Sequence, residues 1–201
     1  MSTQKIDINR ITDNRYQART SYDEIESLAE SITNEGLLQP LLGRVIETEG
    51  GELARHDGEV PVINANRYFE DHEDAVVELA YGHRRLRALQ WMADQYEQET
   101  MFWDRMLNAN PDVKKMAQNG NVKVTVRPLS DESMYRVVAA ENAKREDLNP
   151  IELARSLQMG REEQNMSNTA LANLHGRSTS WVSNQLRLLR LSVQMQEAVA
   201  T

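Results

Sequence analysis

The chain has 201 residues and a formal net charge of −8, and with 40% hydrophobic and 27% charged residues its composition is ordinary for a globular protein. It has no cysteine, which excludes disulfides and thiolate metal sites, and it has neither a membrane-length apolar run nor a signal peptide at its start. These features predict a cytoplasmic protein of one or two domains that does not bind membranes.

The elements predicted in chain order alternate between strands and helices. Apolar patterning predicts strands at residues 5–11, 41–46, 75–80 and 122–126. A helix is predicted from Ser21, which would form a capping box with Glu24, to about Gly36. Further helices are predicted after Gly82 and over residues 131–142. The connections over residues 47–74 and 94–120 are long; the first is interpreted as an irregular hairpin and the second as an added helical segment.

The alternation of strands and helices ends near Asn149. This residue caps the next predicted helix, and Pro150 takes its first position. Everything after it is predicted to be helical. The sequence therefore predicts two domains, residues 1–148 and residues 149–201.

A cationic corner is predicted where the strand over residues 75–80 turns into the next helix at Gly82. Arg84, Arg85 and Arg87 gather in the first turns of that helix. Free backbone N–H groups and positive charge converge there, which suits a phosphate. Arginines on a helix are equally explained as a solvated or ion-paired face, so the corner alone leaves both interpretations open.

Residues 167–190 have the pattern of a helix-turn-helix. A small residue, Ala172, lets the two helices cross closely, and Gly176 makes the turn. An ordinary helical hairpin is the alternative, because His175 and Gln185 fall where an apolar residue usually packs; Trp181 is expected in the core. The second helix would present four side chains outward to phosphates and base edges: Ser180, Ser183, Asn184 and Arg187.

Charge in the C-terminal part is compatible with DNA binding. The net negative charge of the chain argues against indiscriminate nucleic-acid binding, which rests on cationic surface. From Gln164 onward, however, the only charged side chains are Arg177, Arg187, Arg190 and Glu197. A locally basic part can bind DNA on an acidic chain.

In their order and spacing these segments resemble the ParB family of chromosome and plasmid partition proteins. Residues 16–19 (Tyr-Gln-Ala-Arg) resemble the family's first nucleotide motif, and residues 36–41 its first phosphate motif. Residues 82–88 resemble its glycine–glutamate–arginine–arginine box, and residues 141–152 the segment that follows. The helix-turn-helix comes next, as in the family, so the resemblance covers most of residues 5–199.

The resemblance implies an α+β fold, with a small mixed-sheet ParB/sulfiredoxin-like N-terminal domain followed by an all-α helix-turn-helix domain. It also implies a DNA clamp that binds CTP with Mg²⁺ and recognises a palindromic, centromere-like site in double-stranded DNA. Site binding would promote self-association of the N-terminal domains. A ParA-type ATPase would be the usual partner, and the protein would associate with the nucleoid or a plasmid.

The resemblance assigns the binding residues one by one. The nucleotide-binding set is Gln17, Ala18, Arg19, Gly36, Gln39, Pro40, Gly82, His83, Arg84, Arg85, Arg87, Ala88, Lys144 and Arg145. Glu141 and Asn142 would supply hard oxygen ligands to magnesium; without the resemblance they are better explained as a capped helix end. The DNA-binding set is Ser167, Asn168, Thr169, Arg177, Ser178, Thr179, Ser180, Ser183, Asn184 and Arg187.

The sequence departs from the family at several points. His83 stands where the family has glutamate, so we expect CTP hydrolysis to be weak or absent while binding survives. Lys144 replaces the usual glutamine, and the connections over residues 47–74 and 94–120 are longer than usual. Few residues precede the first predicted strand, so a ParA-contacting tail is expected to be nearly absent. Because the chain stops at Thr201, the family's C-terminal dimerisation domain is expected to be missing, either because the sequence is truncated or because the protein dimerises in another way.

Two other functions fit the same sequence. One is a ParB-like transcriptional repressor with a degenerate nucleotide pocket. The other is a nuclease or phosphotransferase on the ParB fold, although no tight cluster of acids or histidines indicates a two-metal site.

Overall fold

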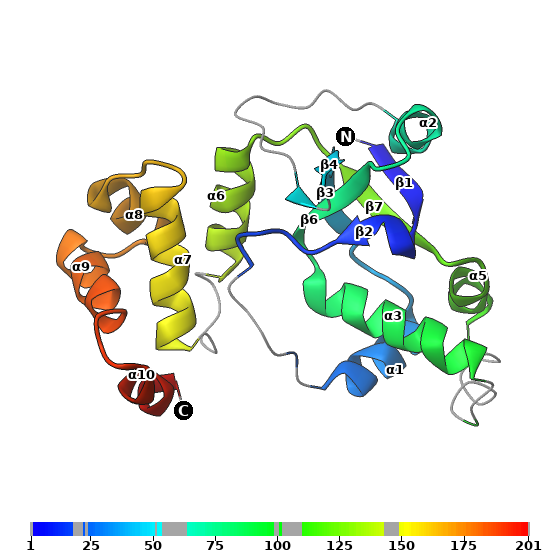
Figure 1. The fold of residues 1–201 in the computed structure, drawn as a ribbon. Coiled ribbons are helices and arrows are strands. Elements are labelled where there is room, and N and C mark those ends of the chain that lie inside the picture. The colour runs from blue at the N-terminus through cyan, green and yellow to red at the C-terminus, as the bar shows by residue number, and fades with distance from the viewer. Residues whose placement is uncertain are drawn as a thin grey trace. The chain divides into compact units, whose positions relative to one another are not determined.

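The structure is a computed structural model that describes residues 2–17, 22, 24–50, 52–53, 64–98, 101, 110–142 and 149–200 (Figure 1). The chain divides into two compact units. We call residues 1–14 with 22–129 the sheet unit, and residues 15–21 with 130–201 the helical unit.

In the described residues, the sheet unit is built on a five-stranded mixed sheet. The strand order is β1 (Ser2–Asp7), β7 (Asn121–Val126), β3 (Leu41–Ile46), β6 (Val76–Tyr81) and β2 (Ile11–Thr12). The β1–β7 and β3–β6 pairs are antiparallel, and the β3–β7 and β2–β6 pairs are parallel. All six residues of the central strand β3 are buried, as expected for a strand covered on both faces. The mixed sheet followed by helices confirms the predicted α+β class.

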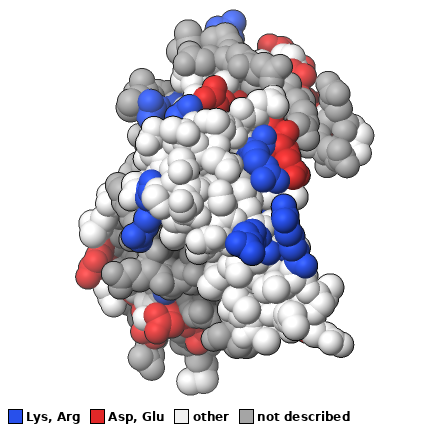
Figure 2. Space-filling model, turned by 90° about the vertical axis from the view of Figure 1, so that its left-hand side faces the viewer, with Lys and Arg blue, Asp and Glu red and all other residues white. Residues whose placement is uncertain are grey.

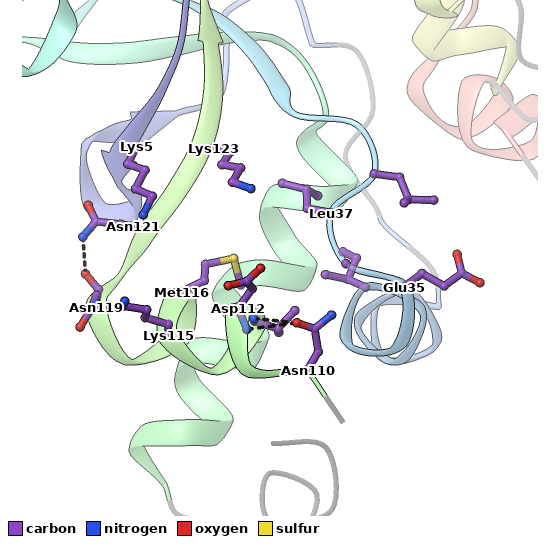
Figure 3. Close-up of a pocket in the computed structure, with 14 residues that line it drawn as sticks. Lys5, Glu35, Leu37, Asn110, Asp112, Lys115, Met116, Asn119, Asn121 and Lys123 are labelled. Atoms are coloured by element: carbon purple, nitrogen blue, oxygen red, sulfur yellow. Dashed lines mark hydrogen bonds between the residues drawn. The ribbon is translucent and has the colours of Figure 1, made fainter. Parts of the chain in front are cut away.

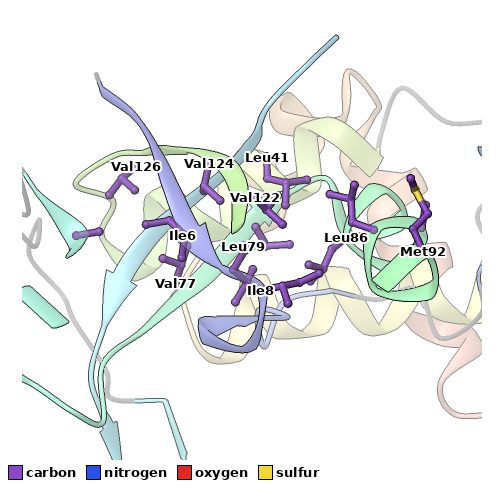
Figure 4. Close-up of a cluster of buried hydrophobic side chains, with 14 of the residues drawn as sticks. Ile6, Ile8, Leu41, Val77, Leu79, Leu86, Met92, Val122, Val124 and Val126 are labelled. Atoms are coloured by element: carbon purple, nitrogen blue, oxygen red, sulfur yellow. The ribbon is translucent and has the colours of Figure 1, made fainter. Parts of the chain in front are cut away.

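Helices pack their apolar faces against this sheet. α1 (Ile25–Glu35) lies beside α3 (His83–Glu97), α5 (Pro111–Asn119) also packs on α3, and α2 (Ala65–Asp71) packs on β1. Figure 4 shows Leu86 and Met92 of α3 in one buried cluster with Leu41, Leu79 and Val124 of the strands. Removal of this apolar surface from water is the main stabilising contribution to the unit.

An ion pair is buried inside the sheet. Arg44 on β3 and Glu78 on β6 are register partners, and both side chains are fully buried. An Nη atom of Arg44 lies 2.7 Å from a carboxylate oxygen of Glu78, and the other Nη donates a 2.8 Å hydrogen bond to the carbonyl of Leu129. Each charge can be buried only because the other is present.

The helical unit holds α6 (Asp131–Asn142), α7 (Pro150–Glu162), α8 (Asn168–His175), α9 (Thr179–Leu188) and α10 (Val193–Ala200). α7 packs on α8 and α9, and α6 packs on α8. The side chain of Asn149 accepts a 2.7 Å hydrogen bond from the N–H of Ile151, which confirms the predicted cap of α7. None of the helices in the described part of the chain is both long enough and apolar enough to span a bilayer.

Some predicted boundaries were wrong. The strand predicted over residues 5–11 is interrupted by a 3-10 turn, because the side chain of Asp7 accepts a hydrogen bond from the N–H of Asn9. α1 begins at Ile25, with Glu24 as N-cap in the left-handed region, later than the cap predicted at Ser21; Ser21 itself is outside the described residues.

The predicted irregular hairpin over residues 47–74 is partly regular. It holds the short strands β4 (Thr48–Glu49) and β5 (Glu52–Leu53) and the helix α2. α2 is capped by Asn64, whose side chain accepts a hydrogen bond from the N–H of Arg67.

The compact units differ from the predicted division between residues 148 and 149. α6 groups with the helical unit, and so does the segment over residues 15–21. Within that segment Tyr16 is buried, and its ring packs edge-to-face on Tyr135 of α6 with ring centres 5.8 Å apart. The Tyr16 hydroxyl accepts a 3.0 Å hydrogen bond from Gln164. One buried tyrosine therefore joins an N-terminal loop to the C-terminal helices.

Candidate functional site

A glycine corner joins β6 to α3. Gly82 is the N-cap of α3, has a φ of 102°, and leaves the helix without a side-chain cap. A Cβ at this position would lie 2.6 Å from the side chain of Leu41, so both backbone and space require glycine. The first-turn N–H groups lie at the positive end of the helix dipole and have no side-chain acceptor. The corner is therefore suited to an anion.

Arg85 is held beside this corner. It donates a 2.6 Å hydrogen bond to the carbonyl of Gln39 and a 3.3 Å bond to that of Pro40. Its guanidinium lies 5.5 Å from the ring centre of Tyr81 and 3.5 Å from where a Gly82 Cβ would be. The structure thus brings Gln39, Pro40, Gly82 and Arg85 together.

Arg84 and Arg87 differ in their partners. Arg84 meets the exposed carboxylate of Glu24 at 3.4 Å, and its buried Nε has no hydrogen-bond partner among the described residues. Arg87 pairs with the carboxylate of Asp13 and donates a 2.9 Å hydrogen bond to Gln90. An exposed pair such as Arg84–Glu24 contributes at most about 1 kcal/mol. Arg84 therefore has the most hydrogen-bonding capacity available for a ligand.

His83 and Ala88 point into the protein. The His83 side chain is 3% exposed, and its Nε2 lies 4.0 Å from a carboxylate oxygen of Asp13. Burial lowers the pKa of His83 to about 4, opposed by Asp13 and assisted by Arg87. The imidazole is therefore neutral near pH 7 and lacks the charge of the glutamate that the motif usually carries. Ala88 is fully buried and packs in the apolar core.

Gly36 lies in the same loop as Gln39 and Pro40 but faces another element. It ends α1 with a φ of 82°, and its N–H donates a 2.8 Å hydrogen bond to the carbonyl of Ile32. A Cβ there would lie 3.8 Å from the side-chain nitrogen of Asn110 at the start of α5. Gly36 lines a pocket between α1 and α5 (Figure 3).

The remaining predicted ligands belong to the helical unit. Gln17 is half-buried and directly follows the buried Tyr16, while Glu141 and Asn142 end α6. Asn142 is 3% exposed, and its Nδ2 has no hydrogen-bond partner among the described residues. Since an amide flip exchanges the side-chain oxygen and nitrogen, the Asn142 oxygen can take the position of this unpaired nitrogen and serve as a metal ligand. Four predicted residues lie outside the described residues: Ala18, Arg19, Lys144 and Arg145.

The predicted helix-turn-helix is present as α8, a turn and α9. Gly176 makes the turn with a φ of 61°, and the N–H of Arg177 donates a 2.9 Å hydrogen bond to the carbonyl of Ala172. Ala172 and Val182 are buried where the two helices meet. Ser167 and Ser178 cap the helices by accepting 3.1 Å hydrogen bonds from backbone N–H groups.

One face of α9 is exposed. Ser180, Ser183, Asn184 and Arg187 lie on it at helical spacing, with Ser183 also accepting a 3.3 Å hydrogen bond from Asn168. The side of the molecule viewed in Figure 2 shows Lys and Arg side chains, and several Asp and Glu side chains, spaced over a largely uncharged surface. The other predicted DNA contacts, Thr169, Arg177 and Thr179, are also exposed.

Three side chains at the turn form an aromatic and cationic group. Trp181 is half-buried, so its expected core position is only partly correct. Its ring centre lies 5.9 Å from that of His175 and 5.8 Å from the guanidinium of Arg177. Burial lowers the pKa of His175, which is half-buried at the end of α8.

Two family models match the chain. The ParB N-terminal domain matches residues 1–98, and the ParB HTH domain matches residues 146–201. The chain belongs to the ParB family.

Curated ParB-family relatives align with nearly the whole chain. It is 32% identical over 197 residues to a probable chromosome-partitioning protein ParB of Helicobacter pylori. That alignment covers 97% of this chain and 50% of the relative. It is 29% identical over 197 residues to a nucleoid occlusion protein of Geobacillus sp. strain WCH70, covering 97% and 52%. The chain thus spans about half the length of the curated relatives it matches.

Solved structures of ParB from Caulobacter crescentus are also similar. The C-terminally truncated protein complexed to the centromeric parS site matches with a TM-score of 0.49 and 23% identity, over 96% of this chain and 75% of that chain. The same truncated protein complexed with CTP-gamma-S matches with a TM-score of 0.41 and 25% identity, over 99% and 84%.

The ParB motifs did not point to every residue of the corner. Asp13 contacts both His83 and Arg87, and Tyr81 stacks near Arg85. Asp13 stands just before the predicted loop motif, but its pairing with an arginine 74 positions later has no sequence signal. Tyr81 had one, because it stands between the strand predicted over residues 75–80 and an arginine-rich turn.

Proposed function

We propose that this chain is the nucleotide- and DNA-binding part of a ParB-type partition protein. It binds CTP with Mg²⁺ through its N-terminal motifs and a palindromic double-stranded DNA site through its helix-turn-helix, and it acts as a nucleotide-gated clamp associated with the nucleoid or a plasmid. The observation that carries the proposal is the corner of Gly82, Arg84 and Arg85, where an uncapped helix start, a space that excludes Cβ and two guanidinium groups converge.

The corner supplies the contacts that phosphates need. Arg84 and Arg85 would bind phosphate oxygens, and Gly82 would let the backbone approach closely. The buried Nε of Arg84 has no hydrogen-bond partner among the described residues, which supports a ligand at this place. Gln39 and Pro40 orient Arg85 through their carbonyls.

Magnesium would be held at the end of α6. Glu141 and Asn142 are the proposed ligands, together with phosphate oxygens and water, because Mg²⁺ usually takes only one or two ligands from the protein at nucleotide sites. In the described part of the chain, no three His, Asp or Glu side chains gather in a group that could hold a metal. The proposal assigns Gln17, Glu141 and Asn142 to the same nucleotide, which would connect its binding to the helix-turn-helix.

A nucleotide panel tests the first half of the proposal. Titration calorimetry with CTP, UTP, ATP and GTP, with and without Mg²⁺, should show binding of CTP only, and only with magnesium. Arg84→Ala should abolish it, while Arg136→Ala, an exposed arginine paired with Glu132 on α6, should not. Equal affinity for all four nucleotides would contradict the proposal. Absence of any nucleotide binding, with DNA binding retained, would favour a repressor with a degenerate pocket.

Selection of bound DNA fragments tests the second half. We expect a palindromic site whose affinity falls in Arg187→Ala by about 1–3 kcal/mol, with Arg136→Ala again as the control. Unchanged binding of Arg187→Ala would remove α9 from the proposed interface. Cross-linking with site DNA and CTP present should reveal self-association, and co-purification with a ParA-type ATPase tests that partner.

Hydrolysis is a separate measurement. Because His83 is buried and neutral, we expect weak phosphate release that rises in His83→Glu. Equal turnover would show that this position does not limit the reaction.

A further inference from the structure

A cavity in the sheet unit is lined by residues that, except for Gly36, have no assigned part in the proposed function. It has a volume of about 480 Å³ and lies between the end of α1, the loop after it, α5, and strands β1 and β7 (Figure 3). Pockets for small molecules span roughly 300–1,000 Å³, so this volume fits a small organic ligand.

Three lysines line this cavity. Lys5 on β1 and Lys123 on β7 are directly opposite each other in the antiparallel pair, and Lys115 comes from α5. Among the residues that the structure describes, none of the three forms an ion pair. Like charges directly opposite on neighbouring strands destabilise the sheet, so a bound anion would remove an existing repulsion.

The cavity also has polar amides and an apolar wall. Asn121, the first residue of β7, donates a 3.1 Å hydrogen bond to the carbonyl of Asn119, and both line the cavity. Leu37 and Met116 line it as well, as does Leu38, which is 76% exposed. An exposed leucine beside lysines offers an apolar contact next to cationic groups.

The two acids of the cavity come from the helices. Glu35 ends α1 and Asp112 lies in the first turn of α5, whereas Lys5 and Lys123 come from the strands. In Figure 3 Lys5 and Lys123 lie on one side of the cavity and Glu35 on the other. An anion would therefore bind at the strand side, with its apolar body toward Leu37 and Met116.

We propose that this cavity binds a small organic anion, a carboxylate or a phosphate monoester with an apolar body. Lys5 and Lys123 hold the anionic group, and Leu37 and Met116 contact the apolar part. A lysine ammonium is a point charge and accepts either head group. Lys5 and Lys123 are distinct from the Gly82 corner, while Gly36 and Leu37 of the predicted phosphate motif also line the cavity.

The test uses 8-anilinonaphthalene-1-sulfonate, an anion with an aromatic body whose fluorescence rises in apolar surroundings. We expect saturable binding to the full chain and displacement by octanoate or phenyl phosphate; which of the two displaces it at lower concentration identifies the head group. 1-Octanol should displace it poorly. The variant with Lys5→Gln and Lys123→Gln should bind about tenfold more weakly, equivalent to about 1.4 kcal/mol.

Two control variants make the result specific. Lys114→Gln changes a neighbouring lysine of α5 that does not line the cavity and should leave affinity unchanged. Arg84→Ala should also bind the probe normally, which separates this site from the nucleotide corner. The double lysine variant should keep its fold, verified by circular dichroism, and melt at a higher temperature than the ligand-free parent. Equal probe affinity in the double variant, no binding at all, equal displacement by 1-octanol, or displacement only by an acidic peptide would each overturn the proposal.

Discussion

The phenolic oxygen of Tyr16 accepts a 3.0 Å hydrogen bond from Nε2 of Gln164, a residue 148 positions later in the chain. The same ring packs on Tyr135, whose hydroxyl donates a 3.1 Å hydrogen bond to the carbonyl of Ser156. Since Gln17 is the next residue, the start of the predicted nucleotide motif is anchored in the helical unit.

Substitutions of Tyr16 should therefore lower the stability of the C-terminal helices. Tyr16→Phe removes one partly buried hydrogen bond and should cost about 1 kcal/mol. Tyr16→Ala also leaves a cavity and should cost about 3 kcal/mol or more. Urea unfolding, followed by tryptophan fluorescence and by amide exchange of α6 and α7, measures both. Tyr68→Phe, which removes a hydroxyl that donates to Glu47 in the sheet unit, is the matched control; equal exchange in α6 and α7 for wild type and Tyr16→Ala would refute the anchor.

Alanine substitutions at Gly82 and Gly50 distinguish the cost of backbone strain from the cost of steric crowding. Both have positive φ, but a Cβ at Gly82 would lie 2.6 Å from Leu41, whereas nothing lies within 4 Å at Gly50. Gly50→Ala should cost about 1 kcal/mol, from the left-handed backbone alone. Gly82→Ala should cost about 1–3 kcal/mol more, since Leu41 must move. Chemical denaturation measures the free energy of unfolding of both variants. Similar losses would mean that the Leu41 side chain moves aside at little cost.

Stability should depend on pH through His83. In the unfolded chain the His83 imidazole is protonated near pH 6.5, whereas in the folded chain it is protonated only near pH 4. The free energy of unfolding is therefore highest above pH 6.5 and falls as the pH drops toward 4, by as much as about 3 kcal/mol. Urea titrations across this range should show the slope. His83→Gln should flatten it, and an unchanged slope in that variant would assign the effect to other groups.

The buried pair of Arg44 and Glu78 gives a double-mutant test. Glu78→Gln leaves Arg44 as an uncompensated buried charge, so we expect a loss of about 3–5 kcal/mol. Replacing both, as Arg44→Met with Glu78→Leu, should cost much less than the sum of the two single changes. Equilibrium unfolding of the four proteins gives the coupling energy, and simple additivity would show that the two charges do not depend on each other.

Much of the sheet unit could be predicted from the sequence because its elements have strong local signals. β3 and β6 are mostly apolar apart from Arg44 and Glu78, and Gly82 marks the turn into α3. The cap of α7 at Asn149 and the turn at Gly176 were likewise predicted, since each depends on one or two adjacent residues.

The features that could not be predicted are those that depend on distant partners. Asp13 meets Arg87 across the fold, and Tyr16 is buried among helices far along the chain. The pairing of Lys5 with Lys123 follows from strand register, which neither strand shows alone. The roles of the nucleotide and DNA residues stay predictions.

Because residues 15–21 belong to the helical unit, the chain passes between the two units three times, after Asn14, after Ser21 and after Leu129. No single cut therefore yields two self-sufficient fragments. A fragment that begins at Ser130 lacks Tyr16 and exposes to solvent the part of the Tyr135 ring that Tyr16 covers. A chimera that takes residues 130–201 from a relative would pack Tyr16 against non-native side chains. Residues 15–21 should therefore be exchanged together with residues 130–201.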